Sequence, residues 1–228
     1  MPAWWARPAA GFRPRAAVLV LPEVFGVNGW VRSVAERLAG HGYAALALPI
    51  FSRTAPDLDV GYDAAGLTEG RRHRDQLTAA QFFDDARAAI AWLQAQPGLE
   101  KRPVGCVGFC FGGHLALLAA TLPEVAATCD FYGARVSTDR PGGGPPTLAV
   151  VPQISGTLLC FCGDKDPLMP PEELAAIQAA LAANGQPPLI VAAGAGHGFM
   201  CEASADFNPA AAAQGWHQML ALFAERLL

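Results

Sequence analysis

The sequence has few charges and no long apolar run. Charged residues make up only 16% of the 228 residues, and the net charge is −4 at pH 7. Nucleic acids and anionic membranes require clustered positive charge, so this balance argues against both as partners. No stretch approaches the roughly 18 apolar residues of a membrane span. The N-terminal segment carries Pro2, Pro8 and Pro14 and lacks the apolar core of a signal peptide, so we expect a cytoplasmic protein.

Cysteine pairs of the CxxC type and zinc-site spacings of Cys and His are also missing, although the sequence contains six cysteines. A reducing cytoplasm leaves such cysteines as free thiols. Cys160 and Cys162 alternate with Phe161 in an apolar run, which favours small core residues over a redox pair. We therefore expect no metal ion and no organic cofactor.

The chain is rich in apolar residues. They make up 52% of the sequence, which excludes global disorder. Short runs that are apolar on both faces alternate with stretches of helical spacing, and this predicts a mostly parallel sheet covered by helices on both sides. The length of 228 residues fits one large domain or two small ones. The expected strands cover residues 16–21, 43–48, 104–109, 125–132, 157–162 and 189–192, and the expected helices cover residues 30–39, 78–93, 112–120, 171–184 and 210–227.

The segments between these elements indicate where a site belongs. Residues 50–76 form a long polar excursion, and loops of that length are uncommon unless they are functional. In a parallel sheet the ligand site lies beyond the carboxyl ends of the strands. We therefore look for chemistry in the residues that directly follow the strands, which are 23–26, 110–113, 164–166 and 196–198.

The strongest motif is G-x-C-x-G, formed by Gly108, Cys110 and Gly112 between an expected strand and an expected helix. It matches the nucleophile elbow, in which a sharp turn lifts a side chain above the sheet and small residues must flank that turn. Cysteine stands here where serine is usual. The N–H groups and the dipole at the start of the helix favour an anion. A tight turn with an inert thiol is the alternative interpretation.

A nucleophile needs a base and a residue that orients the base. In this kind of fold the acid and then the histidine follow the nucleophile along the chain. Asp166 and His197 each follow an expected strand, so both can reach the end of the sheet where Cys110 lies. Asp164 is the competing carboxylate, and we interpret it as a turn-capping residue.

The other histidines lack this context. His114 comes four residues after Cys110, so we expect it to lie along the flank of the helix in a structural role. His217 is expected at a surface or edge position of the last helix. His41 and His73 follow no expected strand.

Taken together, these residues resemble the dienelactone hydrolase family of the α/β-hydrolase fold. The most specific part of the resemblance pairs the segment EVFG at 23–26 with the elbow GFCFGG at 108–113, a combination that ordinary serine esterases do not carry. The resemblance covers roughly residues 16–227. It implies a single domain over residues 1–228 with an α/β-hydrolase fold and no large cap domain, and an enzyme that hydrolyses a small ester or lactone.

The resemblance also implies roles for individual residues. Cys110, His197 and Asp166 form the implied catalytic triad, and an acyl-thioester on Cys110 is then released by water. The implied oxyanion hole consists of the backbone N–H groups of Val24 and Phe111. No cofactor is implied.

Glu23 has an implied role of its own, because the family places this carboxylate in contact with the thiol of the resting enzyme. The helix N-terminus and His197 favour a thiolate at Cys110, whereas a carboxylate opposes it by like-charge repulsion. The resemblance implies a thiol kept neutral until substrate displaces Glu23. Such a thiol is protected from oxidation, since the thiolate is the oxidisable form.

The substrate-binding residues depart from the family pattern. Known members hold an anionic substrate with two arginines. Arg74 aligns best with the first, in competition with Arg71 and Arg72, but Cys201 stands at the position of the second. Thr78 stands where the family has a tyrosine. A solvated turn is the alternative interpretation of the three arginines.

Phe25 and Phe199, together with Phe111, flank the expected site and are candidates for the wall of an apolar acyl pocket, with ordinary core packing as the alternative. Other functions stay open from the sequence. They are a general carboxylesterase or thioesterase on the same triad, a non-catalytic binding protein of the same fold, and a thiol redox protein in which Cys106 or Cys201 lies near the elbow. We expect a small-molecule substrate and a monomer or weak homo-oligomer.

Overall fold

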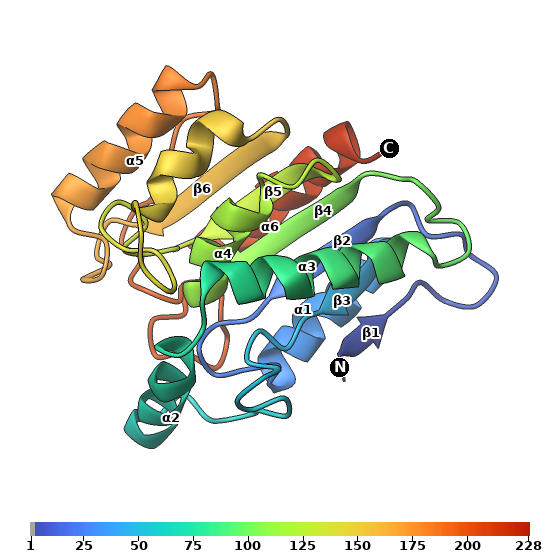
Figure 1. Cartoon of the computed structure of the whole chain (residues 1–228), viewed down its shortest axis with the longest axis horizontal. Coiled ribbons are helices and arrows are strands. Elements are labelled where there is room, and N and C mark those ends of the chain that lie inside the picture. Colours follow the sequence, from blue (N-terminus) through green and yellow to red (C-terminus); the bar gives the residue numbers. More distant parts are fainter. Residues whose placement is uncertain (1–2) are drawn as a thin grey trace.

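The computed structural model describes residues 3–228 and contains, within that range, a seven-stranded sheet with helices on both faces (Figure 1). Met1 and Pro2, which the single-domain and signal-peptide predictions included, lie outside the described residues. The strands are β1 (Trp4–Ala6), β2 (Ala17–Leu21), β3 (Ala44–Ala47), β4 (Val104–Phe109), β5 (Val125–Phe131), β6 (Thr157–Gly163) and β7 (Ile190–Ala192). The helices are α1 (Gly29–Gly40), α2 (Ala64–Arg74), α3 (Ala79–Gln94), α4 (Phe111–Ala119), the 3-10 helix η1 (Thr147–Gln153), α5 (Pro171–Ala183) and α6 (Pro209–Arg226).

The strand order in the sheet is β1-β3-β2-β4-β5-β6-β7. β1 pairs antiparallel with β3, and the other neighbouring strands pair in parallel. The predicted mostly parallel sheet is therefore confirmed. Among the described residues, no helix combines the length and the apolar character needed to cross a membrane.

The strands send alternate side chains into two hydrophobic cores. Leu19 and Leu21 of β2 face the core beneath α3, α4 and α5, whereas Val18 and Val20 face the core beneath α1 and α6. Strand side chains alternate with a period of two, so a strand that is buried on both faces reads as a continuous apolar run. Figure 1 shows α3 and α4 on the near side of the sheet and α6 behind it. Because helices cover both faces, the carboxyl ends of the strands are left open for a site.

Three elements were not expected from the sequence. β1 is a three-residue edge strand, which is too short to give a period. η1 contains Pro152 and shows no helical apolar pattern. α2 lies inside the segment 50–76, and its buried residues are Gly66, Gly70 and His73, so it has no apolar stripe. The sequence does contain a start signal for α2, because aspartate is a favoured N-cap residue. In the structure the side chain of Asp63 accepts a hydrogen bond from the N–H of Gly66.

Candidate active site

Cys110 lies on a strained turn between β4 and α4. Its backbone φ is 54° and its ψ is −118°, a conformation that residues other than glycine rarely adopt. The turn is tied on both sides: the N–H of Cys110 donates to the carbonyl of Phe131 at 3.0 Å, and the carbonyl of Cys110 accepts from the N–H of His114 at 3.1 Å. The thiol is therefore presented at the N-terminus of α4, at the carboxyl end of the sheet, as a nucleophile elbow requires.

His197 and Asp166 form a close pair at the same end of the sheet. Nδ1 of His197 lies 2.7 Å from Oδ2 of Asp166, whose side chain is fully buried. The other carboxylate oxygen, Oδ1, accepts the backbone N–H of Leu168 at 2.8 Å. Asp164 lies elsewhere: it accepts the backbone N–H of Gly194 at 2.7 Å and so joins the loops after β6 and β7. The structure thus places Asp166, and not Asp164, against the imidazole.

The electrostatic setting of His197 couples it to the thiol. Burial lowers the pKa of His197. The negative charge of Cys110 in its thiolate form, together with the hydrogen bond and charge of Asp166, outweighs burial and raises the pKa well above its usual value of 6.5, so that a thiolate and an imidazolium stabilise each other. Nε2, the nitrogen that Asp166 does not use, is buried and has no hydrogen-bond partner within residues 3–228. This nitrogen is therefore free to exchange a proton with a reacting group.

Two candidate backbone donors belong to residues that line the cavity in front of the thiol. Val24 and Phe111 line the same cavity as Cys110, and in the described part of the chain their N–H groups donate to no acceptor. The loop that carries Val24 is supported by α2, because a Cβ placed on Gly70 of α2 would lie 2.2 Å from the carbonyl oxygen of Val24. That close approach requires glycine and fixes the position of one candidate oxyanion donor.

Glu23 is buried beside these donors, with 3% of its surface exposed. Burial raises its pKa from 4.5 to about 7, against the opposing effects of the Tyr62 hydroxyl, the charge of His197 and the Tyr132 hydroxyl. Its Oε2 atom has no hydrogen-bond partner in the described chain, and no hydrogen bond there joins Glu23 to Cys110. Glu23 is therefore poised to change charge near neutral pH.

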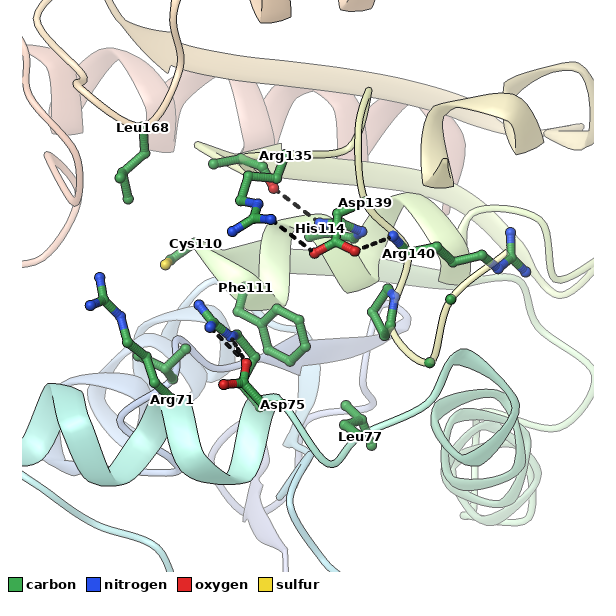
Figure 2. A pocket seen from close by; sticks show the side chains of 16 residues that line it. Arg71, Asp75, Leu77, Cys110, Phe111, His114, Arg135, Asp139, Arg140 and Leu168 are labelled. Atoms are coloured by element: carbon green, nitrogen blue, oxygen red, sulfur yellow. Dashed lines mark hydrogen bonds and ion pairs between the residues drawn. The ribbon is translucent and has the colours of Figure 1, made fainter. Parts of the chain in front are cut away.

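The thiol opens into a cavity of about 540 Å³ (Figure 2). Arginines line much of it, from α2 and from the loop after β5. Arg74 is one of them, but its guanidinium is engaged with Asp75, at 2.8 Å from Nε and 2.7 Å from Nη2. Arg72 lies outside the lining and binds Glu69. The lining residues are Val24, Arg71, Arg74, Asp75, Leu77, Cys110, Phe111, His114, Ala134, Arg135, Asp139, Arg140, Pro141, Gly142, Gly143 and Leu168.

Two expected wall residues are not part of this cavity. Phe111 lines it, but Phe199 is only 1% exposed and packs in the core against Tyr132, with ring centroids 5.1 Å apart. Phe25 packs against Tyr62 at 4.4 Å. The prediction that Phe25 and Phe199 line an apolar acyl pocket is therefore wrong for this cavity, since neither ring is among its lining residues: Phe199 is buried in the core, and the partly buried Phe25 packs on Tyr62.

The sequence reasoning missed the loop after β5. Arg135 and Arg140 both line the cavity. The rule that was applied to the other strands, to inspect the residues after each carboxyl end, would have found Arg135 shortly beyond Phe131. Among residues 3–228 no three His, Cys, Asp or Glu side chains are grouped so that they could hold a metal ion. The predicted core positions of Cys160 and Cys162 are confirmed, at 2% and 0% exposure.

Known proteins resemble this chain along its whole length. The sequence profile of the Dienelactone hydrolase family matches residues 1–227. The "Putative carboxymethylenebutenolidase" of Synechocystis sp. is 39% identical over 92% of this chain and 86% of its own. A "Probable 2-oxo-3-(5-oxofuran-2-ylidene)propanoate lactonase" of Bradyrhizobium sp. is 31% identical over 96% of this chain and 86% of its own. The crystal structure of a "Putative Dienelactone Hydrolase" from Klebsiella pneumoniae superposes with a TM-score of 0.83 at 28% identity, over 99% of this chain and 93% of that one.

Proposed function

Because the chain belongs to the dienelactone hydrolase family and is a hydrolase of the kind that acts on esters or lactones, we propose that it cleaves a small ester or lactone through an acyl-thioester on Cys110. One observation carries the proposal. A cysteine in a strained elbow conformation opens into the cavity that Val24 and Phe111 also line, at the end of the sheet where a histidine lies 2.7 Å from a buried carboxylate.

The proposed reaction runs in two halves. Nε2 of His197 takes the proton of the Cys110 thiol, the sulfur attacks the carbonyl carbon, and the carbon–oxygen bond to the leaving group breaks after the tetrahedral intermediate. His197 returns the proton to the leaving alkoxide. Water then gives a proton to His197 while its oxygen attacks the thioester carbonyl. The carbon–sulfur bond breaks to release the acid, and His197 returns the proton to the sulfur of Cys110, which restores the thiol. Asp166 keeps the proton of the resting imidazole on Nδ1 and stabilises the imidazolium.

The N–H groups of Val24 and Phe111 are the proposed oxyanion donors. Each such donor lowers the barrier by about 3 kcal/mol, because it meets charge that appears only in the tetrahedral intermediate. The Bradyrhizobium relative is named for a lactone that carries a propanoate group, which supports including carboxylate-bearing lactones among the candidate substrates.

Mass spectrometry of the intact protein during turnover of an ester and lactone panel tests the proposal. We expect an acyl adduct on wild type that peptide mapping assigns to Cys110, and none on Cys110→Ala. Cys106→Ala is a matched control, since this cysteine is buried in β4 away from the cavity and its loss leaves the adduct in place. Hydrolysis by Cys110→Ala would overturn the proposal. Simple aryl esters cleaved far faster than any lactone would identify a general carboxylesterase on the same triad.

Glu23→Gln is expected to speed alkylation of Cys110 by iodoacetamide about three- to tenfold at pH 8, because it removes a negative charge that opposes the thiolate. At pH 5, where the Glu23 carboxyl with its pKa of about 7 is already neutral, the two proteins should react alike. The exposed residue Glu36 offers the control Glu36→Gln, which should follow wild type. Equal rates for Glu23→Gln and wild type at both pH values would remove Glu23 from the control of the thiol.

The same substitution has a stability signature. A carboxyl whose pKa is raised on folding costs stability as pH rises from about 4.5 through 7. Glu23→Gln should therefore gain up to about 3 kcal/mol of unfolding free energy relative to wild type at pH 8, and little at pH 4. Urea unfolding at the two pH values measures this difference.

A further inference from the structure

Arg135 stands on the wall of the cavity opposite α2. Figure 2 shows the guanidinium groups of Arg71, from α2, and of Arg135, from the loop after β5, extending into the space around Cys110 from the two sides. We propose that Arg135 is a specificity-determining residue that binds an anionic group on the ester or lactone substrate. This proposal rests on the proposed function, because the anionic group must belong to a molecule whose carbonyl reaches Cys110.

The backbone of Arg135 is held in an unfavourable conformation. Its φ is 65°, in the left-handed region, where a residue with a Cβ costs about 1 kcal/mol. Such residues persist only where the surrounding structure over-determines them, and they gather at functional sites. The loop therefore holds Arg135 in a backbone conformation that arginine by itself disfavours. Two buried side chains, His114 and Glu173, hold the loop in place.

The first anchor is His114, which is 3% exposed. Its Nδ1 lies 3.0 Å from the carbonyl oxygen of Ala134, and its Nε2 lies 2.7 Å from Oγ1 of Thr147. A carbonyl only accepts, so Nδ1 carries the proton and Nε2 accepts from the Thr147 hydroxyl. Burial lowers the pKa of His114, which keeps this neutral tautomer in place. Ala134, the residue before Arg135, is thereby held by a hydrogen bond to a buried side chain of α4.

The second anchor is Glu173, which is also 3% exposed. Its carboxylate accepts the backbone N–H of Ser137 at 3.1 Å and the Ser137 hydroxyl. Between the anchors the carbonyl of Val136 accepts the N–H of Leu148 at 2.8 Å. Burying a histidine and a carboxylate is costly unless both are hydrogen-bonded. Neither has a part in the proposed chemistry, and both fasten the loop on either side of Arg135.

The charge balance of the cavity is positive although the chain is negative overall. Four arginines and two aspartates line the cavity. Asp75 forms an ion pair with Arg74, in which Oδ1 of Asp75 lies 2.7 Å from Nη2 of Arg74. Asp139 lies 3.7 Å from Arg135, and both side chains are more than half exposed, so this ion pair is weak and open to exchange. A substrate carboxylate can displace Asp139 and bind the planar guanidinium through two parallel hydrogen bonds.

A pair of substrates of equal acyl length tests the assignment. Para-nitrophenyl pentanoate is neutral, and mono-para-nitrophenyl glutarate ends in a carboxylate. In Arg135→Gln we expect KM for the glutarate to rise about ten- to hundredfold with kcat within a few-fold of wild type, and both constants for the pentanoate to stay unchanged. Arg135→Asn is the second variant, because asparagine tolerates the left-handed backbone and preserves the loop. Arg87→Gln on the exposed side of α3 makes the same charge change and should alter neither substrate.

The outcomes separate the two proposals. An equal loss on both esters in Arg135→Asn overturns the specificity role and leaves only a structural one. An unchanged KM for the glutarate in both variants overturns it as well. Hydrolysis of either ester by Cys110→Ala overturns the proposed function instead, whatever the result at Arg135.

Discussion

Replacing Asp166 with asparagine should lower kcat/KM for ester hydrolysis about 10⁴-fold without unfolding the protein. Asp166 contributes two separable contacts, since Oδ1 accepts the N–H of Leu168 and Oδ2 faces Nδ1 of His197. An asparagine can keep the first through its amide oxygen. Its NH₂ group then faces Nδ1, which forces the imidazole proton onto Nε2, the nitrogen that must receive the proton of the thiol. The variant also loses the negative charge that supports the imidazolium.

Steady-state kinetics and the rate of iodoacetamide alkylation of Cys110 at pH 7 measure this effect, and both should fall. Asp164→Asn is the matched control, because it makes the same charge change two residues away. Its contact is with the N–H of Gly194, which an amide oxygen can also accept, so we expect activity within about threefold of wild type. Equal losses of activity in the two variants would show that any loss of negative charge in the loop after β6 lowers the rate. That result would contradict the proposed role of Asp166 in keeping the His197 proton on Nδ1.

The parts of this site that could be predicted are those that a short stretch of sequence determines. The elbow needs only Gly108, Cys110 and Gly112 at fixed spacing, between a strand and a helix that are both strongly apolar. Asp166 and His197 were found from chain order, because each follows a short apolar run in the sequence. The run before Asp166 is the largely buried strand β6, whereas the run before His197 is the short strand β7, which is apolar although Val191 is exposed. For the same reason the parallel sheet was predictable, since its central strands β2 and β4 are apolar on both faces.

The arginines of α2 show why the rest could not be predicted. The segment 50–76 was expected to be irregular, so the preference for Arg74 over Arg71 and Arg72 rested on alignment with the family pattern alone and not on side-chain direction. On a helix, residues three apart share a face, which brings Arg71 and Arg74 together onto the cavity and turns Arg72 toward Glu69. α2 buries two glycines and a histidine instead of an apolar stripe, so the pattern that predicts helices was missing. Because α2 was not predicted, the directions of its arginine side chains could not be predicted either.

Gly108→Ala is expected to destabilise the fold by about 4 kcal/mol or more, with a fall in Tm of about 10 °C. A Cβ on Gly108 would lie 1.9 Å from the carbonyl oxygen of Gly112 and 2.8 Å from the backbone nitrogen of Gly113. Both are backbone atoms, so no side-chain rotation relieves the clash, and α4 must move away from β4. β4 lies in the middle of the sheet and is buried over its whole length, which leaves the strand no room to yield instead.

Gly40→Ala is the matched control, because Gly40 ends α1 and no heavy atom lies within 4 Å of a Cβ built there. Alanine is the better helix former, so this variant should gain about 0.5–1 kcal/mol. Urea unfolding of both variants measures the contrast. The helix that follows Cys110 can hold the thiol at a positive φ only while its first turn touches β4. A Gly108→Ala protein as stable as wild type would therefore contradict that contact, and with it the strained turn on which the proposed nucleophile depends.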